Sequence, residues 1–194
     1  MSLNVRIRLL WLKGLAQLAL ILGQREEAMR HFEAMEAVDP GNPYALASRA
    51  QVEDQLGRAA QAITLQRQLT RVTPGQASAW FNLGFMLEKA GDLEDALAAF
   101  REATRLSPAL DRAWYGLGLV LIRLRRFDEA VDALRKNTEL QPMSPYGWYQ
   151  LARVHVDRHE PDEAAKIIRH LKGFEPKVAA QLERETGLRS APSA

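Results

Sequence analysis

The stretch that decides the fold runs from residue 77 to residue 110 and reads ASAWFNLGFMLEKAGDLEDALAAFREATRLSPAL. Apolar residues recur in it at three- and four-residue spacing, in two blocks that lie on either side of Gly91. This spacing is typical of two amphipathic helices, and the glycine marks the turn between them. Pro108 follows the second block, where a proline prevents a helix from continuing. The stretch therefore predicts one helical hairpin.

The same pattern recurs along the chain with a period of 34 residues. A proline marks each period, and the five are Pro40, Pro74, Pro108, Pro142 and Pro176. With each proline at position 32 of a unit, the repeats are residues 9–42, 43–76, 77–110, 111–144 and 145–178. Position 20 is then always alanine, and position 8 is always small, as Ala16, Ala50, Gly84, Gly118 and Ala152. An unbroken period of this length indicates stacked copies of one hairpin.

These positions resemble the signature of the tetratricopeptide repeat family, which is Trp-x2-Leu-Gly-x2-Tyr, then Ala-x3-Phe, then Pro. The third repeat is the closest match, through Trp80, Leu83, Gly84, Leu87, Ala96, Phe100, Ala103 and Pro108. The resemblance implies an all-α fold: a right-handed superhelical solenoid of five antiparallel helix-turn-helix hairpins with a short C-terminal capping helix. It also implies that the first helices of successive repeats line a concave groove.

The two ends of the chain fall outside the repeats. Residues 1–8 form an N-terminal extension, which is either helical or added with an expression vector. Residues 9–178 form the array of repeats. Residues 179–194 complete a capping helix, expected from Lys177 to Thr186, and end in a disordered tail from Arg189. A terminal repeat needs such a polar cover for solubility.

The first predicted helix, over residues 9–22, is apolar nearly all round. It is too short to span a bilayer, and Lys13 and Gln17 make it too polar. A helix at the end of an array should nevertheless show one polar side. We therefore expect its surface to be covered, either by a second copy in a homodimer or by a neighbouring repeat. The residues assigned to this surface are Leu9, Leu10, Leu18 and Ile21.

Charge and cysteine content limit the classes of partner and compartment. The 194 residues carry a net charge of only +2, which predicts no nucleic-acid partner. The absence of cysteine excludes disulfides and thiol chemistry but fits either a reducing or an oxidising compartment. We expect a cytoplasmic location, with the periplasm as the alternative.

The family rule assigns positions 2, 5, 6, 9, 12 and 13 of the first helices to the groove. The aromatic residues at these positions are Tyr44, Phe81, Phe85, Tyr115, Tyr146 and Tyr149, and polar residues among them include Gln51, Asn82, Arg112, Gln150 and Arg153. Aromatic side chains can anchor a peptide, while amides and arginines read its backbone or an acidic group. The alternative is that the position-5 aromatics, Phe81, Tyr115 and Tyr149, pack within the array.

Two further groups of residues depart from an ordinary repeat. In the second repeat, Arg49, Glu53 and Gln66 replace apolar packing residues, and we expect a partly buried Arg49–Glu53 pair with Gln66 nearby. His155 and His159 have a spacing that can suit a metal. Their repeat positions instead predict a packed His155 and a solvated His159 at a turn. No metal, cofactor or catalytic motif is predicted, so we expect no enzyme activity.

Taken as a whole, the sequence predicts a protein-interaction scaffold that holds a peptide segment or a partner helix in its concave groove. The alternative is a structural or regulatory module of a larger enzyme or assembly complex, which associates through its apolar first helix.

Overall fold

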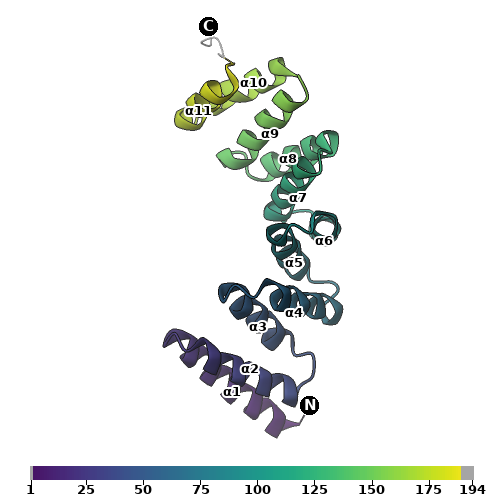
Figure 1. Cartoon of the computed structure of the whole chain (residues 1–194), viewed down its shortest axis with the longest axis vertical. Coiled ribbons are helices and arrows are strands. Elements are labelled where there is room, and N and C mark those ends of the chain that lie inside the picture. The colour runs from purple at the N-terminus through teal and green to yellow at the C-terminus, as the bar shows by residue number, and fades with distance from the viewer. Residues whose placement is uncertain (1, 189–194) are drawn as a thin grey trace. The chain divides into compact units, whose positions relative to one another are not determined.

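The computed structural model describes residues 2–188, and within this range every regular element is an α-helix. Figure 1 shows the eleven helices in chain order. Their bounds are α1 (Leu3–Ile21), α2 (Arg25–Val38), α3 (Pro43–Gln55), α4 (Ala59–Val72), α5 (Ala77–Ala90), α6 (Leu93–Leu106), α7 (Asp111–Arg123), α8 (Phe127–Leu140), α9 (Pro145–Asp157), α10 (Pro161–Lys172) and α11 (Pro176–Thr186). The all-α prediction is confirmed, and the predicted tail from Arg189 lies outside the described residues.

The helices fall into two compact units, Met1–Ala90 and Gly91–Ala194. In unit 1, α1 packs on α2 and α3 packs on α4, while α2 contacts α3 and α4 contacts α5. In unit 2, each helix from α6 to α11 packs on the next one, and α11 also reaches α9. Each unit is therefore built from helices that contact their neighbours in sequence, as hairpin repeats require.

Small residues are buried where paired helices inside a unit meet, as between α7 and α8. The position-20 alanines, Ala28, Ala62, Ala96, Ala130 and Ala164, are each 0% exposed. On α7, Gly118 faces Leu134 of α8 so closely that a Cβ on the glycine would lie 2.7 Å from the leucine side chain. A larger residue at these positions would therefore force the two helices apart.

The position-32 prolines also form a hydrogen bond with the following repeat. The indole Nε1 atoms of Trp80, Trp114 and Trp148 donate to the carbonyl oxygens of Pro74, Pro108 and Pro142, each at 2.9 Å. Each tryptophan lies at position 4, and each proline closes the repeat before it. The start of one repeat is thus bonded to the end of the previous one.

Helix starts follow the expected chemistry only in part. The Asn42 side chain accepts a hydrogen bond from the backbone N–H of Ala45 at 3.0 Å, with Pro43 in the first turn of α3. Asp92 and Ser144 occupy the N-cap positions of α6 and α9, but their side chains make no capping hydrogen bond. Acidic residues in the first turns of α2, α6, α8 and α10 favour the helix dipole there.

The turn inside each repeat has a left-handed backbone at position 15. Gly23, Gly57 and Gly91 have φ values of 73°, 76° and 91°, and Arg125 and His159 each have 59° at the same position. This conformation costs little for glycine but roughly 1–2 kcal/mol for a residue that has a Cβ. The last two repeats therefore carry backbone strain that the first three avoid.

We expect His159→Gly to stabilise the protein by about 0.5–1 kcal/mol, because relief of the left-handed strain exceeds the extra entropy of an unfolded glycine. Chemical denaturation followed by circular dichroism measures the change. His159→Ala is the matched control, since it removes the exposed imidazole but keeps the Cβ, and it should bring no gain. Equal effects of the two substitutions would contradict this explanation.

Candidate peptide-binding site

Unit 2 contains a pocket of about 490 Å³ between α7, α9 and α11. We call it the tyrosine pocket, and its lining consists of Tyr115, Pro145, Tyr146, Tyr149, Gln150, Glu175, Val178 and Gln181. Tyr115, Tyr146, Tyr149 and Gln150 are groove residues that the sequence predicts. The structure therefore brings four predicted residues together on one concave surface.

Helix α9 positions most of the tyrosine pocket. Tyr146, Tyr149 and Gln150 are three and four residues apart, so they share one face of the helix. Tyr146 is 70% exposed, whereas Tyr115 on α7 and Tyr149 are partly buried. The pocket thus offers one freely accessible ring, that of Tyr146, and two partly buried rings.

One wall of the tyrosine pocket is joined to α9 through Glu185 of α11. The Tyr149 hydroxyl donates to Glu185 Oε2 at 2.6 Å, and Arg153 Nη1 lies 3.3 Å from the same oxygen. Gln181 Nε2 donates to Glu185 Oε1 at 2.8 Å. The hydrogen bonds from Tyr149 and Gln181, with a smaller contribution from the charge of Arg153, lower the pKa of Glu185. Arg153, predicted to read an acidic group on a partner, is therefore already paired inside the chain.

The predicted groove residues of unit 1 lie on α3 and α5. Tyr44 and Gln51 belong to α3, and Phe81, Asn82 and Phe85 belong to α5. Phe85 is 51% exposed, Gln51 and Asn82 are also exposed, and Phe81 is partly buried. In unit 2, Arg112 is exposed on α7 but does not line the tyrosine pocket.

Tyr44 is partly covered by side chains of its own unit. Lys13 Nζ lies 4.2 Å from the centre of its ring, and Gln17 Nε2 donates to its hydroxyl at 3.3 Å. The ring also meets Phe32 edge-on, with centroids 6.0 Å apart. This tyrosine therefore contributes to packing as well as to the surface.

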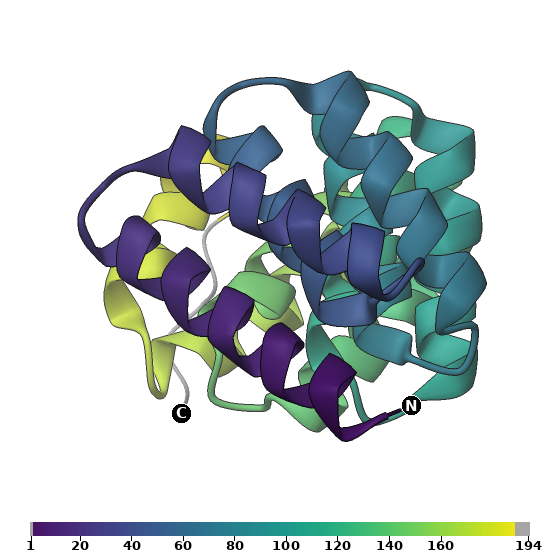
Figure 2. The same ribbon diagram turned by 90° about the horizontal axis from the view of Figure 1, so that it is seen from below.

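The first helix presents a broad apolar surface. We call it the α1 face, and it consists of Leu3, Ile7, Leu10, Trp11, Leu18, Ile21 and Leu22, all more than half exposed. Figure 2 shows α1 in the foreground with α2 beside it. Leu9 does not belong to this face, because it shares the buried side of α1 with Leu12 and Ala16 and is only 8% exposed. None of the helices in residues 2–188 has the length and apolarity needed to cross a membrane.

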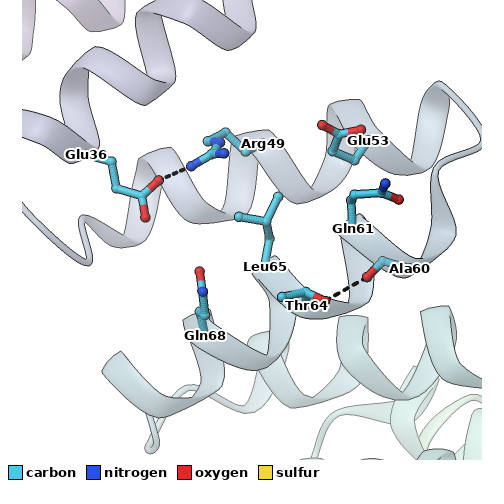
Figure 3. Close-up of a pocket in the computed structure, with 8 residues that line it drawn as sticks. All are labelled: Glu36, Arg49, Glu53, Ala60, Gln61, Thr64, Leu65 and Gln68. Carbon is cyan, nitrogen blue, oxygen red and sulfur yellow. Dashed lines mark hydrogen bonds and ion pairs between the residues drawn. The ribbon is translucent and has the colours of Figure 1, made fainter.

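A second pocket, of about 530 Å³, lies between α2, α3 and α4 of unit 1 (Figure 3). Arg49 points into it and pairs with Glu36 of α2, with Glu33 at 3.4 Å, and not with Glu53 as expected. Glu53 pairs instead with Arg58 at 3.3 Å. The prediction was wrong in its partners because Arg49 lies opposite the acidic side chains of the neighbouring helix. These ion pairs leave the second pocket less suited to a charged partner than its composition suggests.

Gln66 and His155 are both buried with hydrogen-bond partners. Gln66 Nε2 donates to the carbonyl oxygen of Ala79 at 2.8 Å, so it joins α4 to α5 rather than serving Arg49. His155 is 3% exposed, and its Nδ1 lies 2.7 Å from Glu160 Oε2. His159 is exposed at the turn. The two imidazoles are therefore placed as their repeat positions predict.

The sequence did not predict the contribution of α11 to the site. Val178 and Gln181 of α11 line the tyrosine pocket together with Glu175, which directly precedes this helix, and Glu185 bonds to Tyr149. The sequence from Lys177 to Thr186 resembled only a polar cover for the last repeat. The order of the helices could have indicated this role. Because α11 directly follows the second helix of the last repeat, it takes the place of the first helix of a further repeat. The capping helix therefore also stands where the first helix of another repeat would line the groove.

The fold and the site define an α-helical repeat protein with an aromatic concave pocket, and comparisons with known proteins agree with the fold. A tetratricopeptide repeat family model matches residues 13–75, 61–111 and 87–145, which together span more than half of the chain. The chain belongs to the tetratricopeptide repeat family. A search of curated protein sequences finds no significant match.

Solved structures of the same fold are similar over nearly the whole chain. A crystal structure of MamA is 20% identical, with a TM-score of 0.81, and the alignment covers 95% of this chain and 98% of that one. A MamA fragment from Desulfovibrio magneticus RS-1 is 23% identical, with a TM-score of 0.77 and coverage of 93% and 98%. YrrB, described as a TPR protein with an unusual peptide-binding site, is 18% identical, with a TM-score of 0.76 and coverage of 87% and 88%.

We expect Tyr149→Phe to raise the pKa of Glu185 towards its ordinary value, because the hydroxyl is the main group that lowers it. A lowered pKa stabilises the fold above the unfolded-state pKa of Glu185, and this stabilisation is lost as the pH falls through the folded-state value. Carbon NMR of the Glu185 side chain during an acid titration measures the pKa of Glu185 in each variant. Tyr146→Phe is the matched control, since that hydroxyl does not touch Glu185, and equal shifts in the two variants would contradict the assignment.

Proposed function

We propose that this protein is an interaction module that binds a peptide segment of a protein partner in the tyrosine pocket. The fold by itself supports a protein–protein interaction module. The observation that carries the proposal is the convergence of Tyr115, Tyr146 and Tyr149 from two helices onto one concave surface. Proteins of this family generally act as scaffolds rather than enzymes, and we propose no catalytic role.

The chemistry of the tyrosine pocket suits an extended peptide. Tyrosine rings supply large and rigid contact areas, and such residues dominate the binding energy of many interfaces. The amides of Gln150 and Gln181 line the same pocket and can donate to or accept from a peptide backbone. YrrB, which shares the fold, is described as having a peptide-binding site, and this supports a similar role for the present chain.

A peptide library displayed on phage tests the proposal directly. We expect peptides selected on the wild-type protein to bind a Tyr115→Ala/Tyr146→Ala variant at least tenfold more weakly, because each lost aromatic anchor costs about 1–2 kcal/mol. Met143→Ala is the control, because Met143 is 68% exposed in the same unit but outside the pocket. Fluorescence polarisation with synthetic peptides measures the affinities. Equal binding to all three proteins would rule out the tyrosine pocket as the site.

The α1 face supports a second candidate function, association through the first helix. Seven apolar side chains with roughly 100 Å² each to bury offer about 700 Å², close to the ~800 Å² per partner of a stable complex. We propose a second copy of this chain as the occupant. An apolar face of this size on one amphipathic helix is self-complementary when two copies pack together.

The charges of α1 favour an antiparallel pair. Arg6, Arg8 and Lys13 are its only charged residues. Arg6 and Arg8 lie in its N-terminal half, whereas Lys13 lies near its middle, with Nζ 4.2 Å from the centre of the Tyr44 ring. In an antiparallel pair Arg6 and Arg8 face the uncharged C-terminal part of the other copy, whereas a parallel pair would bring these like charges together. The proposed dimer is therefore antiparallel along α1.

We expect Leu10→Glu and Ile21→Glu each to abolish the dimer, because a charge would be buried at the centre or the end of the apolar contact. Both residues are strongly exposed in the single chain, so the fold should be retained, which circular dichroism can verify. Light scattering after gel filtration at several concentrations measures the mass. Met143→Glu is the control for an added surface charge. A wild-type chain that stays monomeric throughout would overturn this second candidate.

A further inference from the structure

Two tyrosines occupy equivalent positions in different repeats, so the contacts of one indicate what the other can bind. Tyr44 and Tyr146 both occupy position 2, and each directly follows a proline at the start of its helix. In the second repeat, the ring of Tyr44 has Lys13 Nζ 4.2 Å from its centre. Lys13 lies at position 5 of the preceding repeat. The chain therefore contains its own example of a cation held by a position-2 tyrosine.

The equivalent cation is missing at Tyr146. Position 5 of the preceding repeat is Tyr115, which is uncharged and lines the same pocket. The ring of Tyr146 is left 70% exposed, whereas Tyr44 is partly buried. The fifth repeat thus carries the equivalent tyrosine, but the fourth repeat lacks the lysine that would cover it.

The charges around the tyrosine pocket have the sign that suits a cation. Glu175 is the only charged residue of its lining, and its carboxylate has no hydrogen bond or ion pair among residues 2–188. The nearby Arg153 is paired with Glu185 at 3.3 Å, so its charge is largely neutralised. A carboxylate beside exposed aromatic rings attracts a cation through both its charge and the quadrupole of the rings.

We infer that the tyrosine pocket accepts a lysine or arginine side chain of the bound peptide. The cation stacks on Tyr146 and faces the carboxylate of Glu175, as Lys13 stacks on Tyr44 in the second repeat. This inference rests on the proposed function, because it names the chemistry of the partner at the same site. It also reverses the charge preference expected from Arg112 and Arg153, which would favour an acidic peptide.

The peptides selected from the phage library test the inference. We expect them to carry lysine or arginine at a common position, and replacement of that residue by norleucine should weaken binding about tenfold. Glu175→Gln should weaken binding about fivefold. Glu139→Gln is the matched control, since it removes the same charge from α8 of unit 2 outside the pocket, and it should leave binding unchanged.

The outcomes separate the inference from the proposed function. Peptides that need Tyr115 and Tyr146 but contain no common cation, or prefer acidic residues, would overturn the inference and leave the proposed function intact. Equal losses for Glu175→Gln and Glu139→Gln would likewise overturn it, because the effect would then be one of net charge alone. Peptides that ignore the tyrosine pocket, or a library that yields none, would overturn both.

Discussion

The close approach of two paired helices inside a unit, as between α1 and α2 or between α7 and α8, is the contact on which the rest of each unit depends. The alanine at position 20 is fully buried in all five repeats. At position 8 of the fourth repeat, Gly118 lies so close to Leu134 that no larger residue fits. Because this contact fixes the rotation of both helices, it also fixes which side chains point outward. The tyrosines of α9 face a concave pocket for this reason.

Much of the fold could be predicted because its determinants are local and repeated. Helices, turns and repeat boundaries follow from apolar spacing, glycine and proline, which act within a few residues. The left-handed backbone at Arg125 and His159 could not be read from those side chains, since residues with a Cβ seldom adopt this conformation. The partner of Arg49 was also missed, because the expected carboxylate, Glu53, lies four residues away on the same helix, whereas the true partners, Glu36 and Glu33, lie across the packed seam.

The candidate site was likewise predictable where repeat position decides it and unpredictable where tertiary packing decides it. Tyr115, Tyr146, Tyr149 and Gln150 were predictable because repeat position alone assigns them to the concave surface. The wall formed by α11 was not, because its polar sequence is equally typical of a solvated end helix. Leu9 was misplaced for a related reason: a helix that is apolar all round does not reveal which side it buries.

The joints between successive repeats are of two kinds. Three of them contain a neutral indole-to-carbonyl bond, as between Trp80 and Pro74, and the joint between the first two repeats lacks it because Leu46 replaces the tryptophan. There, Arg49 bridges to Glu36 and Glu33 instead. Salt screens a charge according to its exposure, and Glu33 is 55% exposed whereas Arg49 and Glu36 are only 21% and 23% exposed. A neutral bond hardly responds to salt. Ionic strength therefore acts mainly on the Arg49–Glu33 part of the joint that attaches the first hairpin, which carries the α1 face.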